Sequence, residues 1–522
     1  MLNLHLSHNT PFQLVLPINL TYLIKNDDLV VSFSEIISQV NLDKYICYRF
    51  TDSRGRLGYN PIDLLKTVLF GFTLEGYASL RKLEDLCRND IRFMFLMRGK
   101  TPSHMTFSNF INNYLVDNLE DIFVEINKVI FEKDKVDLKH LYLDGSKFEA
   151  NANKYSWVWK KSCLTNRLNL YTKITTLLES INTNLLNLEG ITFETREEYA
   201  IEYLEEKLDF LVKHYKIDIT TFVKGRGHSK PLIQRYCELF SRYISKLKEY
   251  AIHIQISGEE RNSYSKTDHG ATFMRIKKDY MGNDQLLPAY NVQLGICDEY
   301  IAVPQVFHYA NDMDTFIPVM NTFKKYYGKY PKYPVADAGY GSFNNYIFCE
   351  ENNVQKYMKF SMYHKLTKDE KYKDDPFRAD NFRIENGKMY CPNNREFIYQ
   401  YSKNIPGNKY GRKHEVYKCE TCANCPLKQQ CTKSSGDRYV KLNKELNQYY
   451  TEALNNLQSI HGVLLLQNRS IQAEGTFGII KYDRWYKRIV RRENLVQSEI
   501  FLVSIGFNIY KYHNKKYRLQ KE

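Results

Sequence analysis

The chain has 522 residues, which is too long for one simple core and predicts two to four domains. Its 74 Lys and Arg residues outnumber its 60 Asp and Glu residues, so the formal net charge is +14. This balance is typical of a protein that binds a polyanion, although lysine enrichment in an AT-rich genome explains it equally well. No apolar run approaches the roughly 18 to 20 residues that span a bilayer, and the first residues lack the pattern of a signal peptide, so we expect a cytoplasmic protein.

Residues 1–135 predict a compact helical domain. The dipeptide Asn60-Pro61 is typical of a helix start, because proline fits the first helical turn. A second helix is expected after Ser79 and a third from Thr106, where apolar residues recur at three- and four-residue spacing. Arg81 is among the basic residues with which this domain would contact DNA, and an ordinary surface role is the alternative.

The pattern changes after this domain, where a short β-prone run ends in Asp144-Gly145. Residues 156–257 return to charged amphipathic helices, and the simplest account is a helical insertion. Strand patterns then resume in two runs joined by Cys297-Asp298-Glu299 as a hairpin, and a further strand ends in Asp337. Strands interleaved with helices predict an α/β domain over residues 136–364 and 434–515.

The C-terminal part predicts two helices, over Leu442–Leu457 and over Ile471–Tyr510. Glu474 lies on the second. Lys481 follows it by seven residues, which at about 100° per residue returns to within about 20° of the same helix face, and Arg488 repeats the step. Together with Arg484 these residues predict a helix whose basic face begins with an acidic residue. The alternative is a solvent-exposed amphipathic helix with ion pairs.

Asp144 and Asp337 each follow a short apolar strand, which predicts that their side chains lie at the strands' C-terminal ends, where α/β sheets gather metal sites. Ordinary turn chemistry is the alternative for each aspartate alone. Phosphodiester cleavage without a covalent intermediate needs an activated water and a stabilised leaving oxygen, which two Mg²⁺ ions about 3.5 to 4 Å apart supply. Because Mg²⁺ prefers carboxylate oxygens, three acids from separate elements beside a basic helix meet this requirement.

Three motifs resemble those of the DDE transposases of bacterial insertion sequences, and they stand in that family's order. They are LYLDGSKFEANANKYSWVWKK, PVADAGYGS and RSIQAEGTFGIIKYDRWYKR. The segment from Arg54 to Leu96, with SHMTFSNF after it, is similar to the helical N-terminal domain of the branch whose catalytic domain is C-terminal. The resemblance covers most of the chain and implies an RNase H-like, integrase-related catalytic core.

The same resemblance implies a function and a set of site residues. Asp144, Asp337 and Glu474 would bind two Mg²⁺ or Mn²⁺ ions, and the protein would cut double-stranded DNA at terminal inverted repeats and join the ends to target DNA, as a homodimer. Lys481 would contact a DNA phosphate near the cut, with Arg484, Arg488 and Arg469 as further DNA contacts. Arg469 precedes Glu474 by five positions, whereas some related groups use shorter offsets. A metal-dependent nuclease that cuts without joining and an inactive DNA-binding remnant are the alternatives.

Five cysteines cluster near residues 365–433, whose proline and glycine content predicts a loop-rich subdomain. The run CETCANCPLKQQC and the upstream Cys391 have a spacing that suits structural Zn²⁺, and a redox motif is the alternative. Five thiols compete for four positions, with His414 as a further candidate. Similar family members favour Cys391, Cys422, Cys425 and Cys431, with Cys419 as the alternate. The remaining cysteines are expected to be reduced core thiols: Cys47, Cys87, Cys163, Cys237, Cys297 and Cys349.

Overall fold

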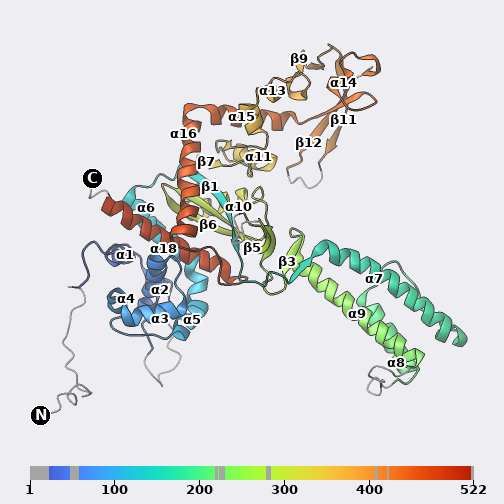
Figure 1. Ribbon diagram of the computed structural model, residues 1–522, viewed down its shortest axis with the longest axis horizontal. Coiled ribbons are helices and arrows are strands. Elements are labelled where there is room, and N and C mark those ends of the chain that lie inside the picture. Colours follow the sequence, from blue (N-terminus) through green and yellow to red (C-terminus); the bar gives the residue numbers. More distant parts are fainter. Residues whose placement is uncertain are drawn as a thin grey trace.

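The computed structural model describes residues 23–46, 58–217, 222, 230–277, 284–405, 410–419 and 422–518. Within these ranges the chain folds around a central mixed sheet (Figure 1). The N-terminal helices lie on one side of this sheet, a cysteine-rich subdomain lies on the opposite side, and a long helical arm projects from the core. None of the helices in these ranges combines the length and the apolar character that crossing a membrane requires.

The N-terminal helices begin where the sequence supplies capping side chains. Asn60 Oδ1 accepts a hydrogen bond from the Ile62 amide at 2.8 Å, and Ser79 Oγ accepts one from the Lys82 amide at 3.2 Å, so both expected helix starts are confirmed. The third helix begins at His104, and a π-helical turn at Ile111–Leu115 interrupts it. The helices are α1 (Leu29–Ile37), α2 (Pro61–Glu75), α3 (Leu80–Asn89), α4 (Ile91–Leu96), α5 (His104–Phe110) and α6 (Leu119–Asp134).

The central sheet has the strand order β4-β5-β1-β7-β8, and β6 also pairs with β5. The pairs β1–β7 and β7–β8 are parallel and the other pairs are antiparallel. The expected hairpin is confirmed between β5 and β6, where Asp298 and Glu299 both have positive φ, as a tight two-residue turn requires. The strands are β1 (His140–Glu149), β4 (Thr272–Arg275), β5 (Leu286–Cys297), β6 (Tyr300–Phe307), β7 (Tyr333–Ala336) and β8 (Tyr357–Met358).

Helices α10 (Phe316–Tyr327), α11 (Phe343–Glu351) and α18 (Leu495–Arg518) accompany the sheet, and one continuous apolar core joins them to the N-terminal helices. Within α18, the buried Asn508 accepts a hydrogen bond from the Ile301 amide at 2.8 Å and donates one to Asn127 Oδ1 at 2.8 Å. These bonds satisfy polar groups in the core, and they fix α18 between the sheet and α6.

Gly506 allows α18 to approach the backbone of α2 closely. A Cβ atom at this position would lie 2.5 Å from the carbonyl carbon and oxygen of Phe72, which belong to backbone that cannot rotate aside. We expect Gly506→Ala to lower the free energy of unfolding by about 1 to 3 kcal/mol in urea denaturation, because overpacking forces the helices apart. Gly478→Ala, where a Cβ would meet open space, is the control and should be neutral or stabilising. Equal effects of the two substitutions would rule out the close contact as the cause.

The projecting arm consists of α7 (Lys160–Ile181), α8 (Ile201–His214) and α9 (Leu232–Ser257). It leaves and rejoins the core through a short pair of antiparallel strands, β2 (Trp157–Trp159) and β3 (Ser263–Ser265). The three helices enclose an apolar core of their own, separate from the main one. The arm therefore packs as a unit on the end of a β ribbon (Figure 1).

The cysteine-rich segment contains an antiparallel five-stranded sheet, so the expectation of a loop-rich subdomain is wrong. The strands escaped prediction because one face of the sheet carries polar and aromatic residues, which hides the alternation of apolar and polar positions. The elements are α12 (Tyr363–Lys368), α13 (Glu370–Lys373), β9 (Arg383–Glu385), β10 (Lys388–Tyr390), β11 (Glu396–Asn404), β12 (Lys413–Cys419), α14 (Lys428–Cys431) and β13 (Arg438–Leu442).

The C-terminal region does not form the single helix expected over Ile471–Tyr510. After α15 (Lys444–Gln458) and α16 (Ile460–Arg469), the chain continues through π-helical turns and α17 (Gly475–Gly478) only as far as Asp483. Residues 484–494 then form a loop before α18. Tertiary hydrogen bonds hold this loop: the Ile489 amide donates to Glu149 O of β1, and the buried Glu499 accepts from the Arg491 amide at 2.7 Å.

Candidate active site

The register of β1 and β7 brings the two predicted aspartates side by side. Tyr142 of β1 pairs with Val335 of β7, and Asp144 and Asp337 each stand two residues further along. Strand β1 does not end at Asp144, as the sequence suggested, because its antiparallel pairing with β5 continues to Glu149. Asp337 directly follows the last residue of β7, as expected.

The guanidinium of Arg469, at the end of α16, contacts all three predicted acids. Its Nη2 atom lies 3.3 Å from Asp144 Oδ1 and 3.9 Å from Asp337 Oδ2. Its Nη1 atom lies 3.1 Å from Glu474 Oε1, in the π-helical turn that follows α16. Three carboxylates that are separated by hundreds of residues in the sequence therefore surround one positive group.

Asp144 is the most buried of these acids, with 19% of its side chain exposed, against 46% for Asp337 and 56% for Glu474. Burial raises the pKa of Asp144 to about 6; the negative charges of Asp337 and Glu474 act in the same direction, and Arg469 opposes them. The Nε atom of Arg469 is buried and has no hydrogen-bond partner among the residues that the structure describes. The site therefore concentrates negative charge that a single arginine only partly compensates.

A fourth carboxylate, Asp312, lies behind the pair of aspartates, and the sequence analysis missed it. Its Oδ1 atom accepts hydrogen bonds from Asn291 Nδ2 at 2.7 Å and from Gln293 Nε2 at 2.8 Å. A Cβ atom on Gly145 would lie 2.9 Å from the same oxygen, so Asp312 packs against the backbone beside Asp144. The sequence did contain a signal for it. Asn291 and Gln293 are two residues apart on an otherwise apolar strand, so their polar side chains share one face and require hydrogen-bond partners there.

Lys481 lies beside the strand that carries Asp144. Its Nζ atom donates to Ser146 Oγ at 2.6 Å and to Lys147 O at 3.0 Å, and it lies 4.2 Å from the centre of the Phe148 ring. Burial lowers the pKa of Lys481 to about 8, and the charge of Asp144 opposes this shift. The amine is therefore held next to the acids and keeps most of its positive charge at neutral pH.

The other predicted basic residues do not share one helix face, because the helix ends before Arg484. Arg484 turns toward the N-terminal domain, where its Nη2 atom donates to Phe72 O at 2.8 Å and to Thr73 O at 2.7 Å. This contact ties the loop after Asp483 to helix α2. Arg488 lies in the loop with half of its side chain exposed, 3.8 Å from Glu149. Arg81 is exposed on α3.

The five clustered cysteines line one cavity of about 20 Å³. Cys419 is buried and in hydrogen-bond contact with Cys391 and Cys422, whereas Cys431 accepts a hydrogen bond from Arg438 Nη1 at 2.7 Å. Across the ranges that the structure describes, no group of three or more His, Cys, Asp or Glu side chains has the arrangement of a metal site. Cys87, Cys163, Cys237, Cys297 and Cys349 are free and buried, as expected, and Cys47 lies outside the described residues.

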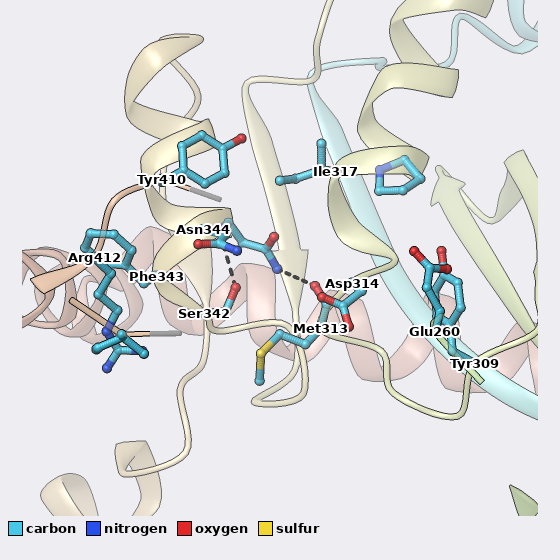
Figure 2. A pocket seen from close by; sticks show the side chains of 13 residues that line it. Glu260, Tyr309, Met313, Asp314, Ile317, Ser342, Phe343, Asn344, Tyr410 and Arg412 are labelled. Atoms are coloured by element: carbon cyan, nitrogen blue, oxygen red, sulfur yellow. Dashed lines mark hydrogen bonds between the residues drawn. The ribbon is translucent and has the colours of Figure 1, made fainter. Parts of the chain in front are cut away.

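A pocket of about 740 Å³ opens beside the segment that follows Asp337 (Figure 2). One wall is the start of α11, including Ser342 and Asn344, and the cysteine-rich subdomain contributes Tyr410 and Arg412. Asn345 Nδ2 donates to Met313 O at 2.9 Å, which ties two parts of the lining together. None of the three acids lines this pocket, so it is separate from their convergence point.

Two family models match the chain, one in its N-terminal part and one in its C-terminal part. Residues 18–113 match the transposase domain DUF772, and residues 390–513 match the transposase DDE domain. The second match includes Glu474 and Lys481, and a DDE domain implies an RNase H-like fold, in agreement with the mixed α/β core. The comparisons with curated proteins and with solved structures gave no match.

Proposed function

Because the chain is a DDE transposase of an insertion sequence, we propose that it cuts DNA at the ends of its element and joins these ends to target DNA. One observation carries the proposal: Asp144, Asp337 and Glu474 converge from three separate elements on a single guanidinium. Carboxylates gathered in this way repel one another, which is a cost that a structural role does not require.

The three carboxylates suit Mg²⁺ or Mn²⁺, because such hard ions prefer oxygen ligands. The arginine at the centre of the acids shows that the site accommodates positive charge. When bound, two such ions activate a water molecule and stabilise the leaving oxygen. Asp144, Asp337 and Glu474 would hold the ions.

The neighbouring cations would hold the DNA. Lys481 keeps its amine beside β1, within reach of the edge of the site, and would bind a phosphate near the cut. The Nη atoms of Arg469 now contact the acids, and they would bind a phosphate oxygen once cations take over the carboxylates. Arg488, on the exposed side of the loop, would contact the backbone further away.

We propose that different parts of the chain have different functions. Residues 1–135 bind the terminal inverted repeats, with Arg81 on the exposed surface of α3. Residues 136–364 and 434–515 form the catalytic domain, with residues 156–257 as a helical insertion and residues 365–433 as a cysteine-rich insertion. Two element ends must be held together before joining, so the working form on DNA is a homodimer.

The assay combines the full chain, Mg²⁺, a duplex carrying an element end, and a target plasmid. We expect joined products. A pre-cut element end whose transferred strand terminates in a 3′-deoxy nucleotide is the control, since it lacks the hydroxyl that attacks the target and should give no joined product. Cut products alone would indicate a nuclease, and binding alone would indicate an inactive remnant; either result overturns the proposal.

We also propose that four of the five clustered cysteines bind structural Zn²⁺, with Cys391, Cys422, Cys425 and Cys431 as the first set and Cys419 as the alternate. Their common cavity supports this. Elemental analysis of the purified protein should give about one zinc per chain, since four thiolates complete a tetrahedral site. Cys425→Ser should lower the content and Cys349→Ser, in the main core, should not. Protein without zinc would refute the site.

A further inference from the structure

Half of the net positive charge of the chain lies in residues 383–442, the stretch that forms β9 to β13. This stretch contains 12 Lys and Arg residues and 5 Asp and Glu residues, so its net charge is +7, against +14 for all 522 residues. Half of the excess thus lies in about a ninth of the chain. Such a concentration indicates a surface for a polyanion better than the total charge does.

Strand register separates the two faces of this sheet. One face carries Phe397, Cys419 and Val440, which pack into the small core around the cysteines. The opposite face consists of three rungs across β11, β12 and β13. The rungs are Ile398–Lys418–Tyr439, Tyr401–Val416–Lys441 and Lys403–His414, and we call these eight residues the outer face.

The outer face combines exposed aromatic rings with basic groups around the buried Val416, and the nearby Asp437 pairs with Lys418 at 3.1 Å. Tyr401 is 53% exposed and Tyr439 is 56% exposed, and Lys403 and Lys441 are also exposed. The Nζ atom of Lys418 lies 6.0 Å from the centre of the Tyr439 ring. The ionisable groups of the three rungs, apart from the tyrosines, are lysines and a histidine.

The surroundings of His414 show the sign of the local field. Burial lowers the pKa of this imidazole first, and the positive charges of Arg412 and Lys441 lower it further. The nearest acid on the same strand, Glu415, points to the other face and pairs with Lys444 at 2.9 Å. Glu415 therefore does not offset the positive charge of Lys403 and Lys441 on the outer face.

We propose that the outer face is a second DNA-binding surface, which holds duplex DNA of any sequence through its phosphates. Lysines neutralise phosphates, and the hydroxyls of exposed tyrosines between them donate to phosphate and sugar oxygens, contacts that read no sequence. The subdomain lies across the core from the N-terminal helices (Figure 1), so DNA held here is a different segment from DNA held by those helices. The assignment of this segment as target DNA rests on the proposed function.

The test compares two double variants of the full chain that change the net charge equally. Lys403→Glu/Lys441→Glu alters the outer face, and Lys213→Glu/Lys246→Glu alters exposed lysines on α8 and α9 of the arm. Fluorescence anisotropy with a short duplex of arbitrary sequence should show about 10-fold or more weaker binding for the first variant. The slope of log affinity against log salt concentration should be smaller in magnitude by about two for this variant. The affinity of the arm variant should stay within about 2- to 3-fold of that of the native protein.

A second variant separates contact from long-range electrostatics. Tyr401→Ala/Tyr439→Ala keeps every charge, and the loss of two hydrogen bonds to the DNA backbone should weaken binding by about 10-fold with an unchanged salt slope. Circular dichroism confirms that each variant is folded. Equal affinities of the outer-face and arm charge variants would overturn the proposal. A native protein that binds this duplex but neither cuts nor joins element ends would overturn the proposed function alone.

Discussion

Changing any one of the three acids to its amide should stop DNA cleavage and leave DNA binding intact. We expect Asp144→Asn, Asp337→Asn and Glu474→Gln each to slow cleavage of an end-bearing duplex by about 1,000-fold or more, equivalent to roughly 4 kcal/mol in the barrier. Each amide keeps the shape of the side chain but removes a charged oxygen ligand. Binding should persist, because the loss of a negative charge cannot weaken the attraction for phosphate.

The measurement is single-turnover cleavage with saturating protein, together with anisotropy for affinity. Asp483→Asn is the matched control: this acid is exposed at the end of the same helical stretch and lies two residues beyond Lys481. Its cleavage rate should stay within about 3-fold of the native rate. A native rate in one of the three active-site variants would remove that residue from the site, and loss of binding in all three would point to unfolding instead.

Features set by short-range chemistry were predictable from the sequence. The caps Asn60 and Ser79 start helices because a side-chain oxygen meets free amides there, whatever the rest of the chain does. The hairpin at Asp298 and Glu299 is similarly local. The sequence placed both aspartates after short strands; the parallel register of β1 and β7 does bring them together, although β1 continues past Asp144.

Features that depend on distant partners were not predictable. The stretch after Asp483 has helical periodicity, yet it forms a loop because β1 and the buried Glu499 bind its amides. The guanidinium of Arg484 donates to the Phe72 and Thr73 carbonyls near the end of α2, a contact that the spacing along the chain does not reveal. Arg469 is adjacent to the acids only because α16 ends above the sheet, a relation that no sequence spacing expresses.

Metal-free Asp144→Asn should be more stable than the native protein, by a margin that grows with pH. In the native fold the pKa of Asp144 is about 6, above its ordinary value of 3.8, so folding favours the protonated carboxyl. Below about pH 4 both states are protonated and the margin is small. Between about pH 4 and 6 the unfolded state ionises first and the native protein loses stability; above about pH 6 the loss is constant, at roughly 3 kcal/mol.

Asparagine cannot ionise, so the variant avoids this loss, although it also gives up the attraction between Asp144 and Arg469. Urea denaturation in EDTA at several values between pH 4.5 and 7.5 measures the margin. Asp314→Asn, which changes an exposed acid in the separate pocket beside α11, should show no comparable rise. Added Mg²⁺ should then stabilise the native protein more than Asp144→Asn, since a cation that binds the folded state favours the ionised carboxylate. A difference in the free energy of unfolding that does not change with pH would contradict the prediction. It would show that burial of the ionised Asp144 does not destabilise the metal-free protein.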